Sequence, residues 1–138
     1  MSFTVRGEAA ALGRLSQLAQ HFRRGVLGGG RAAIDIVVRR AQVGMINGPH
    51  SGVHYPRLPN RSSAPGEYAA TQSGTMLGSI QGTNTFLQMR ISATAPHAGY
   101  LEFGTSRMAP RPVIANAVRD TEGQVQAIIG DWVWRSVA

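Results

Sequence analysis

The chain of 138 residues contains no cysteine, no lysine and no long apolar run. The absence of cysteine excludes disulfide bonds and any metal site or nucleophile that depends on a thiolate. Because no run of about 18 apolar residues exists, we expect no segment that crosses a membrane. The N-terminal residues also lack the apolar core of a secretory signal. We therefore expect a single domain over residues 1–138 that is synthesised in the cytoplasm.

Acidic residues are scarce. The chain contains seven acidic residues and 14 basic residues, all of them arginine, which gives a net charge of +7. Arginine binds phosphate bidentately, so contact with nucleic acid is one interpretation. The arginines are spread from Arg6 to Arg135, however, and no basic run is interleaved with aromatic residues as in a platform for single strands. The other interpretation is a GC-rich genome that encodes arginine in place of lysine, together with few acids, so that the charge serves long-range contact with acidic protein or DNA. A basic nucleic-acid-binding module stays as the alternative function.

Apolar spacing predicts a short strand at residues 2–6 and then a long helical segment. Leu12, Leu15, Ala19 and Phe22 share one face of that helix, and the same phase resumes after the glycine triplet at 28–30. The segment is therefore two helices or one long helix kinked at the triplet. A phosphate cradle would need a strand before the triplet and a lysine or acid at a set spacing, and both are missing. We interpret the triplet as a hinge or a point of close approach.

Residues 44–74 differ in composition, with five glycines, four prolines and almost no apolar periodicity. A segment of this kind is typical of a long loop, and we expect an extended loop or arm that orders on a neighbouring subunit. It contains His50 and His54, but Pro49 and Pro56 argue against the helix that would place the two imidazoles on one face. We therefore expect no metal site.

The second half predicts a small antiparallel sheet and a second long helix. Leu77 and Ile80 point inward from a short capped turn, residues 82–85 form a hairpin turn, and residues 85–94 form a strand with one apolar face. Pro112 suits the first turn of a helix that continues to the C-terminal end. The expected fold class is α+β: a small antiparallel sheet packed against a long N-terminal helix and a C-terminal helix, with a long loop.

Residues 95–112, here called the corner, connect the strand to this last helix. The corner contains three prolines and two glycines, which indicates a rigid turn. One helical turn over residues 98–103 would place Tyr100 and Phe103 on the same side. Glu102 is its one acid, and we expect its carboxylate to brace the corner by accepting hydrogen bonds near Gly104 and Thr105 or from an arginine. General acid–base catalysis usually needs a second titratable group close by, and His97, five residues earlier, is the only local candidate. We predict that Glu102 is structural and that the chain is not an enzyme.

Two sequence blocks together resemble a known family. Residues 100–112 followed by 113–118 form one block, and residues 63–67 followed by 71–80 form the other. Both resemble signatures of phage tail-component proteins, which belong to the neck and tail-completion proteins of long-tailed phages. The chain departs from the usual pattern at Gln72, Ser73, Gly78 and Val113. The residues that carry the resemblance, expected as a structural and interface motif, are Pro65, Gly66, Glu67, Gly74, Leu77, Ser79, Ile80, Tyr100, Glu102, Phe103, Gly104, Thr105, Pro110 and Pro112.

The resemblance implies a structural virion protein of the neck or tail, assembled in the host cytoplasm. Such a protein would form a ring, most simply a hexamer, as a tail-completion or tail-terminator component that joins the head connector to the tail tube. Its partners would be copies of itself, adjacent connector proteins and the tail-tube protein, with DNA passing through the channel without sequence-specific binding. It would need no cofactor and no metal.

Overall fold

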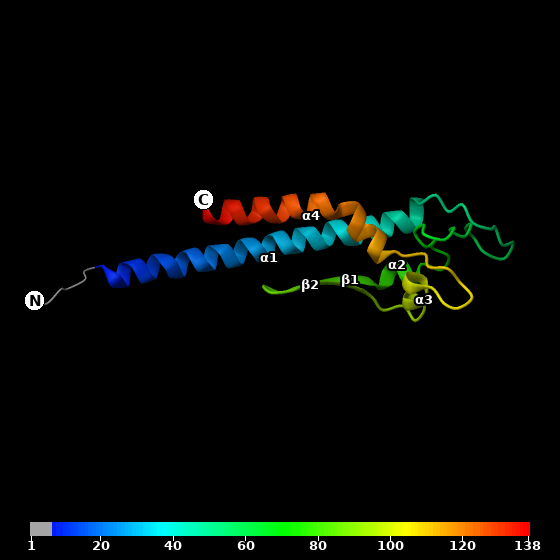
Figure 1. Ribbon diagram of the computed structural model, residues 1–138, viewed down its shortest axis with the longest axis horizontal. Helices are drawn as coiled ribbons and strands as arrows, with labels where there is room; N and C mark the ends of the chain where they lie inside the picture. The colour runs from blue at the N-terminus through cyan, green and yellow to red at the C-terminus, as the bar shows by residue number, and fades with distance from the viewer. Residues whose placement is uncertain (1–6) are drawn as a thin grey trace, which may run out of the picture.

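The longest element is helix α1, which runs unbroken from Glu8 to Asn47 in a computed structural model that describes residues 7–138. The strand predicted at residues 2–6 lies outside the described residues. The other elements, in chain order, are α2 (Thr75–Ser79), β1 (Ile80–Asn84), β2 (Met89–Ala93), α3 (Ala98–Phe103) and α4 (Ile114–Val137). Figure 1 shows α4 lying along one side of α1 and the β1–β2 hairpin along the other, with the loops and α3 gathered at one end.

The predicted α+β fold is confirmed: a two-stranded antiparallel sheet packs against a long N-terminal helix, and a C-terminal helix completes the fold. The hydrophobic core lies between α1, α4 and the loop end of the molecule. Its buried members are Val37, Ala41, Met45, Tyr68, Ala69, Met76, Ile80, Ala95, Ala98, Val113 and Ala117. The prediction that Pro112 lies in the first turn of α4 is wrong, because α4 begins two residues later, at Ile114.

The glycine triplet of α1 is a point of close approach inside one continuous helix, so the alternative of two separate helices is wrong. A Cβ atom at Gly29 would lie 3.0 Å from the Cα atom of Ile129, so α4 packs directly against the backbone of α1 there. A Cβ at Gly28 would meet the ring of Trp132 at 2.5 Å, and one at Gly30 would meet the Asn84 side chain at 2.7 Å. Small residues thus let both α4 and the hairpin contact this stretch of helix.

The hairpin turn is not at residues 82–85, as the sequence predicts. Those residues belong to β1 or follow it directly, and the chain reverses slightly later, where Thr85 N–H donates to the Gln88 carbonyl at 2.8 Å. The reason lies in the packing against α1. Gly82 crosses the Ile34 side chain so closely that a Cβ would overlap it, and the amide of Asn84 donates to the Leu27 carbonyl at 2.7 Å.

The predicted strand over residues 85–94 is correspondingly shorter, because only Met89–Ala93 pair with β1. Leu87 occupies the tip of the turn and is 90% exposed, so it lies off the apolar face on which we expect it. Ile91 does pack against the core, half-buried, as its position in the alternating pattern predicts.

The loop between α1 and α2 spans residues 48–74 and folds back on its own chain. Gly52 and Val53 exchange backbone hydrogen bonds with Ser62 at 2.8 and 3.1 Å, and Thr71 N–H donates to the Met45 carbonyl at 3.2 Å. The Tyr68 ring enters the core and lies against Gly44, where a Cβ would approach it to 2.5 Å. The expectation that this loop orders on a neighbouring subunit stays a prediction.

Candidate interaction site at the corner

Helix α3 turns the chain sharply at its C-terminal end. Gly104 adopts φ 75°, a left-handed conformation that favours glycine, and its N–H donates to the Tyr100 carbonyl at 2.9 Å. A Cβ at Gly104 would also lie 2.7 Å from the Met108 carbonyl oxygen, so a larger residue would be strained on both counts. Thr105 N–H closes a tight loop by donating to the same carbonyl at 2.8 Å.

Glu102 connects α3 to the start of α4. Its carboxylate accepts hydrogen bonds from the backbone N–H groups of Val113, Ile114 and Ala115 at 2.8, 3.1 and 2.7 Å. These N–H groups have no acceptor within the helix, and the partial positive charge of a helix N-terminus favours a carboxylate there. The sequence predicts a bracing carboxylate with backbone donors. The donors nevertheless belong to the start of α4 and not to residues 104–105.

The structure brings parts of the two sequence blocks together. Arg111 donates through Nε to the Ser63 carbonyl at 2.7 Å, and Gly66 N–H donates to the Pro110 carbonyl at 2.9 Å. Asn116, on the first turn of α4, donates to the Gly66 carbonyl at 3.0 Å. Residues 63–67 and the corner therefore form one hydrogen-bonded unit around the start of α4.

The Glu67 carboxylate stabilises the turn at residues 64–67 by accepting hydrogen bonds, as the Glu102 carboxylate does at the corner. Its carboxylate accepts hydrogen bonds from the Ser51 hydroxyl, from Ser51 N–H at 3.0 Å and from Ala64 N–H at 2.7 Å. These bonds, the Ser51 hydroxyl bond first among them, lower the pKa of the Glu67 carboxyl. Gly66, at φ 83°, supplies the positive φ that this turn requires, and the neighbouring Pro65 is exposed.

The remaining motif residues around α2 support the fold. Gly74 precedes α2 at φ 78°, and its carbonyl accepts the Gly78 N–H at 3.0 Å. Ile80 is buried and Leu77 is half-buried, as expected. The Ser79 hydroxyl donates to the Met76 carbonyl at 2.8 Å, and Met76, which is not among the residues expected from the sequence, is itself a core residue.

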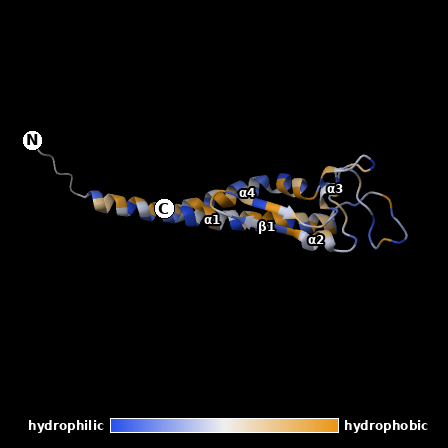
Figure 2. Ribbon diagram, turned by 90° about the horizontal axis from the view of Figure 1, so that it is seen from below, coloured by the Kyte–Doolittle hydropathy of each residue, from blue (hydrophilic) through white to orange (hydrophobic). Residues whose placement is uncertain are grey.

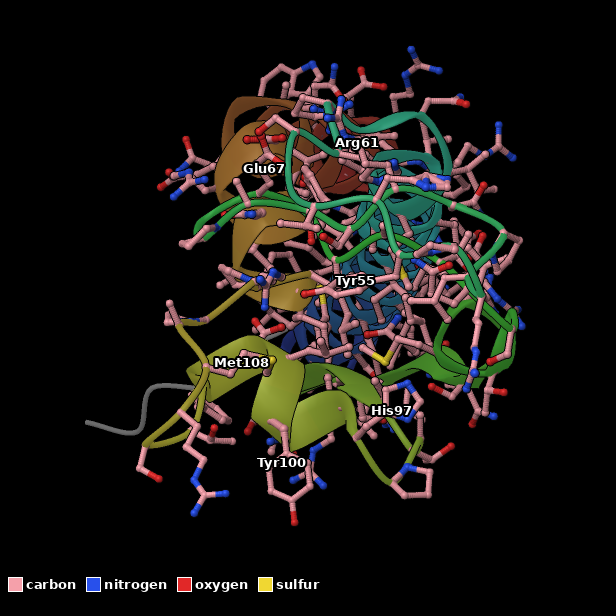
Figure 3. The ribbon with its side chains drawn as sticks, turned by 90° about the vertical axis from the view of Figure 1, so that its right-hand side faces the viewer. Tyr55, Arg61, Glu67, His97, Tyr100 and Met108 are labelled. Atoms are coloured by element: carbon pink, nitrogen blue, oxygen red, sulfur yellow. The ribbon has the colours of Figure 1, made fainter. Side chains whose placement is uncertain are left out.

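The two aromatic residues of α3 face outward. Tyr100 is 61% exposed and Phe103 is 84% exposed, and Figure 3 shows Tyr100 projecting away from the body at this end of the molecule. Pro110 and Pro112 stiffen the connection behind them. The corner thus presents two exposed rings on a backbone fixed by hydrogen bonds and a left-handed glycine, which is a geometry suited to contact with another protein.

A second polar cluster connects α1, the loop and α4. Both Arg40 Nη2, at 2.7 Å, and the Tyr68 hydroxyl, at 2.8 Å, donate to Asp120 Oδ2. The Arg40 guanidinium also lies 5.5 Å from the centre of the Tyr68 ring. The pKa of Asp120 is lowered mainly by the hydrogen bond from Arg40 and, to a smaller extent, by the one from Tyr68. The pKa of Tyr68 is raised to about 12, mainly by burial and also by its hydrogen bond to Asp120. No sequence pattern indicates this cluster, because its members lie up to 80 residues apart.

We predict that Asp120→Asn makes the unfolding temperature less dependent on pH in acid. The folded-state pKa of Asp120 lies below its ordinary value of 3.8, so its stabilising effect is present above that value and is lost as the pH falls through the lower folded value. Calorimetric scans at a series of acidic pH values measure the difference. Asp35→Asn is the control, since Asp35 forms no ion pair within residues 7–138. Equal pH dependence in wild type and Asp120→Asn would contradict the prediction.

Within the described residues, no three His, Asp or Glu side chains come together as a metal ligand set. The Glu102 carboxylate is occupied by three backbone donors, which suits a helix cap better than a general base. Over residues 7–138, no helix combines the length and the apolar character needed to span a bilayer. The expectation that the chain is not an enzyme stays a prediction.

Compared with protein-family models, curated proteins and solved structures, the chain matches none of them. The resemblance of the two blocks to phage tail-component proteins therefore stays a prediction. The hydrogen bonds from Arg111 to Ser63 and from Asn116 to Gly66, which span 48 and 50 residues of sequence, do join the two blocks in space.

Proposed function

We propose that this chain is a structural subunit of the neck or tail of a long-tailed phage, which assembles with copies of itself into a ring of tail-completion or tail-terminator type. The ring, in its simplest form a hexamer, would join the head connector to the tail tube around the DNA channel. The subunit would have a structural role in the ring and would catalyse no reaction.

One observation carries the proposal: α1 extends well beyond the part of the chain that packs against it. Every residue from 8 to 24 is exposed, and the helix continues past the C-terminal end of α4 in Figure 1. Here we call residues 8–24 the stalk. Helices owe most of their stability to the packing of an apolar face, so a stalk of this kind is typical of a subunit that is completed by a neighbour.

A second exposed surface, at the opposite end, supports the same interpretation. Tyr100 and Phe103 project from the corner near the loops, whereas the stalk forms the other end of the elongated molecule. A ring subunit in a tail must contact its neighbours within the ring and also the components stacked above or below it. Two separate apolar surfaces on one subunit suit that task.

The mass of the protein in solution tests this proposal. We expect size-exclusion chromatography with light scattering to show a defined oligomer whose mass changes little between low and high salt, because apolar contacts are not screened. The alternative, a nucleic-acid-binding module, predicts a monomer whose affinity for a short DNA duplex falls steeply with salt, measured by fluorescence anisotropy. A monomer with that salt dependence would contradict the ring.

A further inference from the structure

The stalk carries a broad apolar stripe that nothing within residues 7–138 covers along most of its length. Leu12, Leu15 and Leu18 are 58%, 62% and 49% exposed, and Phe22 is 43% exposed. Only Phe22 has an aromatic neighbour among the described residues, the ring of Phe86 at the hairpin tip, at 6.4 Å and nearly perpendicular to it. The stripe is therefore much larger than the isolated apolar residues that any protein surface contains.

The body of the molecule contains an apolar groove of about 300 Å³ between β2 and α4, with α1 as its floor. Its apolar lining comes from three elements: Ala33, Ile34 and Val37 of α1, Met89 and Ile91 of β2, and Val118 and Val125 of α4. Met89 and Val118 are 48% and 46% exposed, so the groove is open to solvent. Figure 2 shows apolar residues in orange along the hairpin and the adjoining helices.

The stalk stripe and the groove lie on the same side of α1. Leu15, Phe22, Val26, Ala33 and Val37 are separated by 7, 4, 7 and 4 residues, which is the spacing of one helix face. Leu15 nevertheless stands about 27 Å from Ala33 along a continuous helix. The stalk therefore cannot fold back into the groove of its own chain.

The groove of another copy fits the stalk in spacing and in charge. Leu15 and Phe22 are seven residues apart, about 10 Å along the helix, and Val118 and Val125 on the groove wall have the same spacing. The stalk contains three arginines and one glutamate, whereas Glu122 lines the groove and forms no ion pair within the described chain. The net positive charge of the stalk thus complements Glu122, the one charged residue among the described residues that line the groove.

We infer that the stalk of one copy occupies the apolar groove between β2 and α4 of a second copy. The inference rests on the proposed self-assembly and names the surfaces that make it. The contact passes in one direction from each copy to the next, and it closes a ring when the rotation between successive copies completes a full turn.

Cysteine crosslinking between different copies tests this contact, and the cysteine-free chain gives a clean background. We mix Ala19→Cys, on the stalk stripe, with Gln126→Cys, on the groove wall, and oxidise the mixture. The matched control replaces Ala19→Cys by Gln20→Cys, because the neighbouring glutamine is turned by about 100° around the helix, away from the stripe. We expect a crosslinked dimer in gels for the first mixture and at most a trace for the control.

A pair of charge variants provides a second readout. Leu12→Glu with Leu15→Glu places two acids on the stripe, whereas Gln17→Glu with Gln20→Glu places two acids, at the same spacing, on the polar face of the same stalk. All four positions are exposed, so both variants should keep the wild-type circular dichroism spectrum. We expect the first pair to raise the dissociation constant for self-association by at least about a hundredfold, and the second to change it little.

The outcomes separate this contact from the proposed function. Crosslinking at position 19, together with loss of association in the stripe variant alone, supports the stalk-in-groove contact. An oligomer that forms without that crosslink, or that survives the stripe variant, overturns the contact while leaving the proposed ring intact. A chain that stays monomeric at every concentration overturns both.

Discussion

Replacing Glu102 by alanine is expected to destabilise the fold by about 2–3 kcal/mol, a large part of the roughly 5–15 kcal/mol typical of a domain. The variant loses three hydrogen bonds from a carboxylate to the N–H groups of residues 113–115 and leaves the start of α4 without its cap. The carboxylate also interacts favourably with the helix dipole. Urea unfolding should show a midpoint lowered by about 1 M or more.

Two further variants separate capping from a general effect of charge. Glu102→Gln keeps one acceptor oxygen and should lose about half as much stability as the alanine variant. Asp35→Asn removes an exposed acid of α1 that has no ion-pair partner among the described residues, and its effect should stay within about 0.5 kcal/mol. Hydrogen exchange should accelerate at the amides of residues 113–115 in the Glu102 variants alone. Unchanged exchange there would show that Glu102 is not the cap.

Replacing Gly29 by glutamine is expected to separate α1 from α4 at a cost of about 2–4 kcal/mol. A Cβ at this position would lie 3.0 Å from both the Cα atom of Ile129 and the Cβ atom of Trp132, and the first of these is backbone that cannot rotate away. The clash should exceed the gain of up to about 1 kcal/mol that a better helix former brings. Thermal or urea unfolding measures the difference.

Gly13 provides the matched control for this substitution in the same helix. No atom lies within 4 Å of a Cβ built there, so Gly13→Gln should stabilise the protein by up to about 1 kcal/mol through helix propensity alone. Destabilisation by Gly29→Gln together with stabilisation by Gly13→Gln would show that the triplet serves the close packing of α1 against α4. A Gly29→Gln variant as stable as the wild type would show instead that the two helices do not need this contact.

The helical character of the two long segments could be predicted from the sequence because their apolar residues return every three or four positions, as in Leu12, Leu15 and Ala19. The continuity of α1 through the glycine triplet could not be predicted, because periodicity alone leaves two helices as an alternative. The hairpin could be predicted as well, but its turn could not be located. Gly82 and Asn84 are typical turn residues, and here they serve the packing of β1 against α1. A local pattern does not reveal that a glycine is needed by a helix far away in the chain.

The candidate site, like the fold, could be predicted only in part. The rigid corner and the bracing carboxylate follow from the prolines, Gly104 and the single acid. The donors to Glu102, however, come from residues 11 to 13 positions downstream, and only the folded chain places them there. Side chains joined over 80 residues, such as Arg40 and Asp120, leave no periodic signal in one sequence. The exposure of the stalk depends on how far α4 reaches along α1, which periodicity does not specify.

Native mass spectrometry of the 138-residue chain measures self-assembly into a closed ring. We expect one dominant closed stoichiometry, a hexamer in its simplest form, that dissociates to monomers when acids are introduced at Leu12 and Leu15. A protein that remains a monomer at every concentration, with the same mass in wild type and variant, would contradict it.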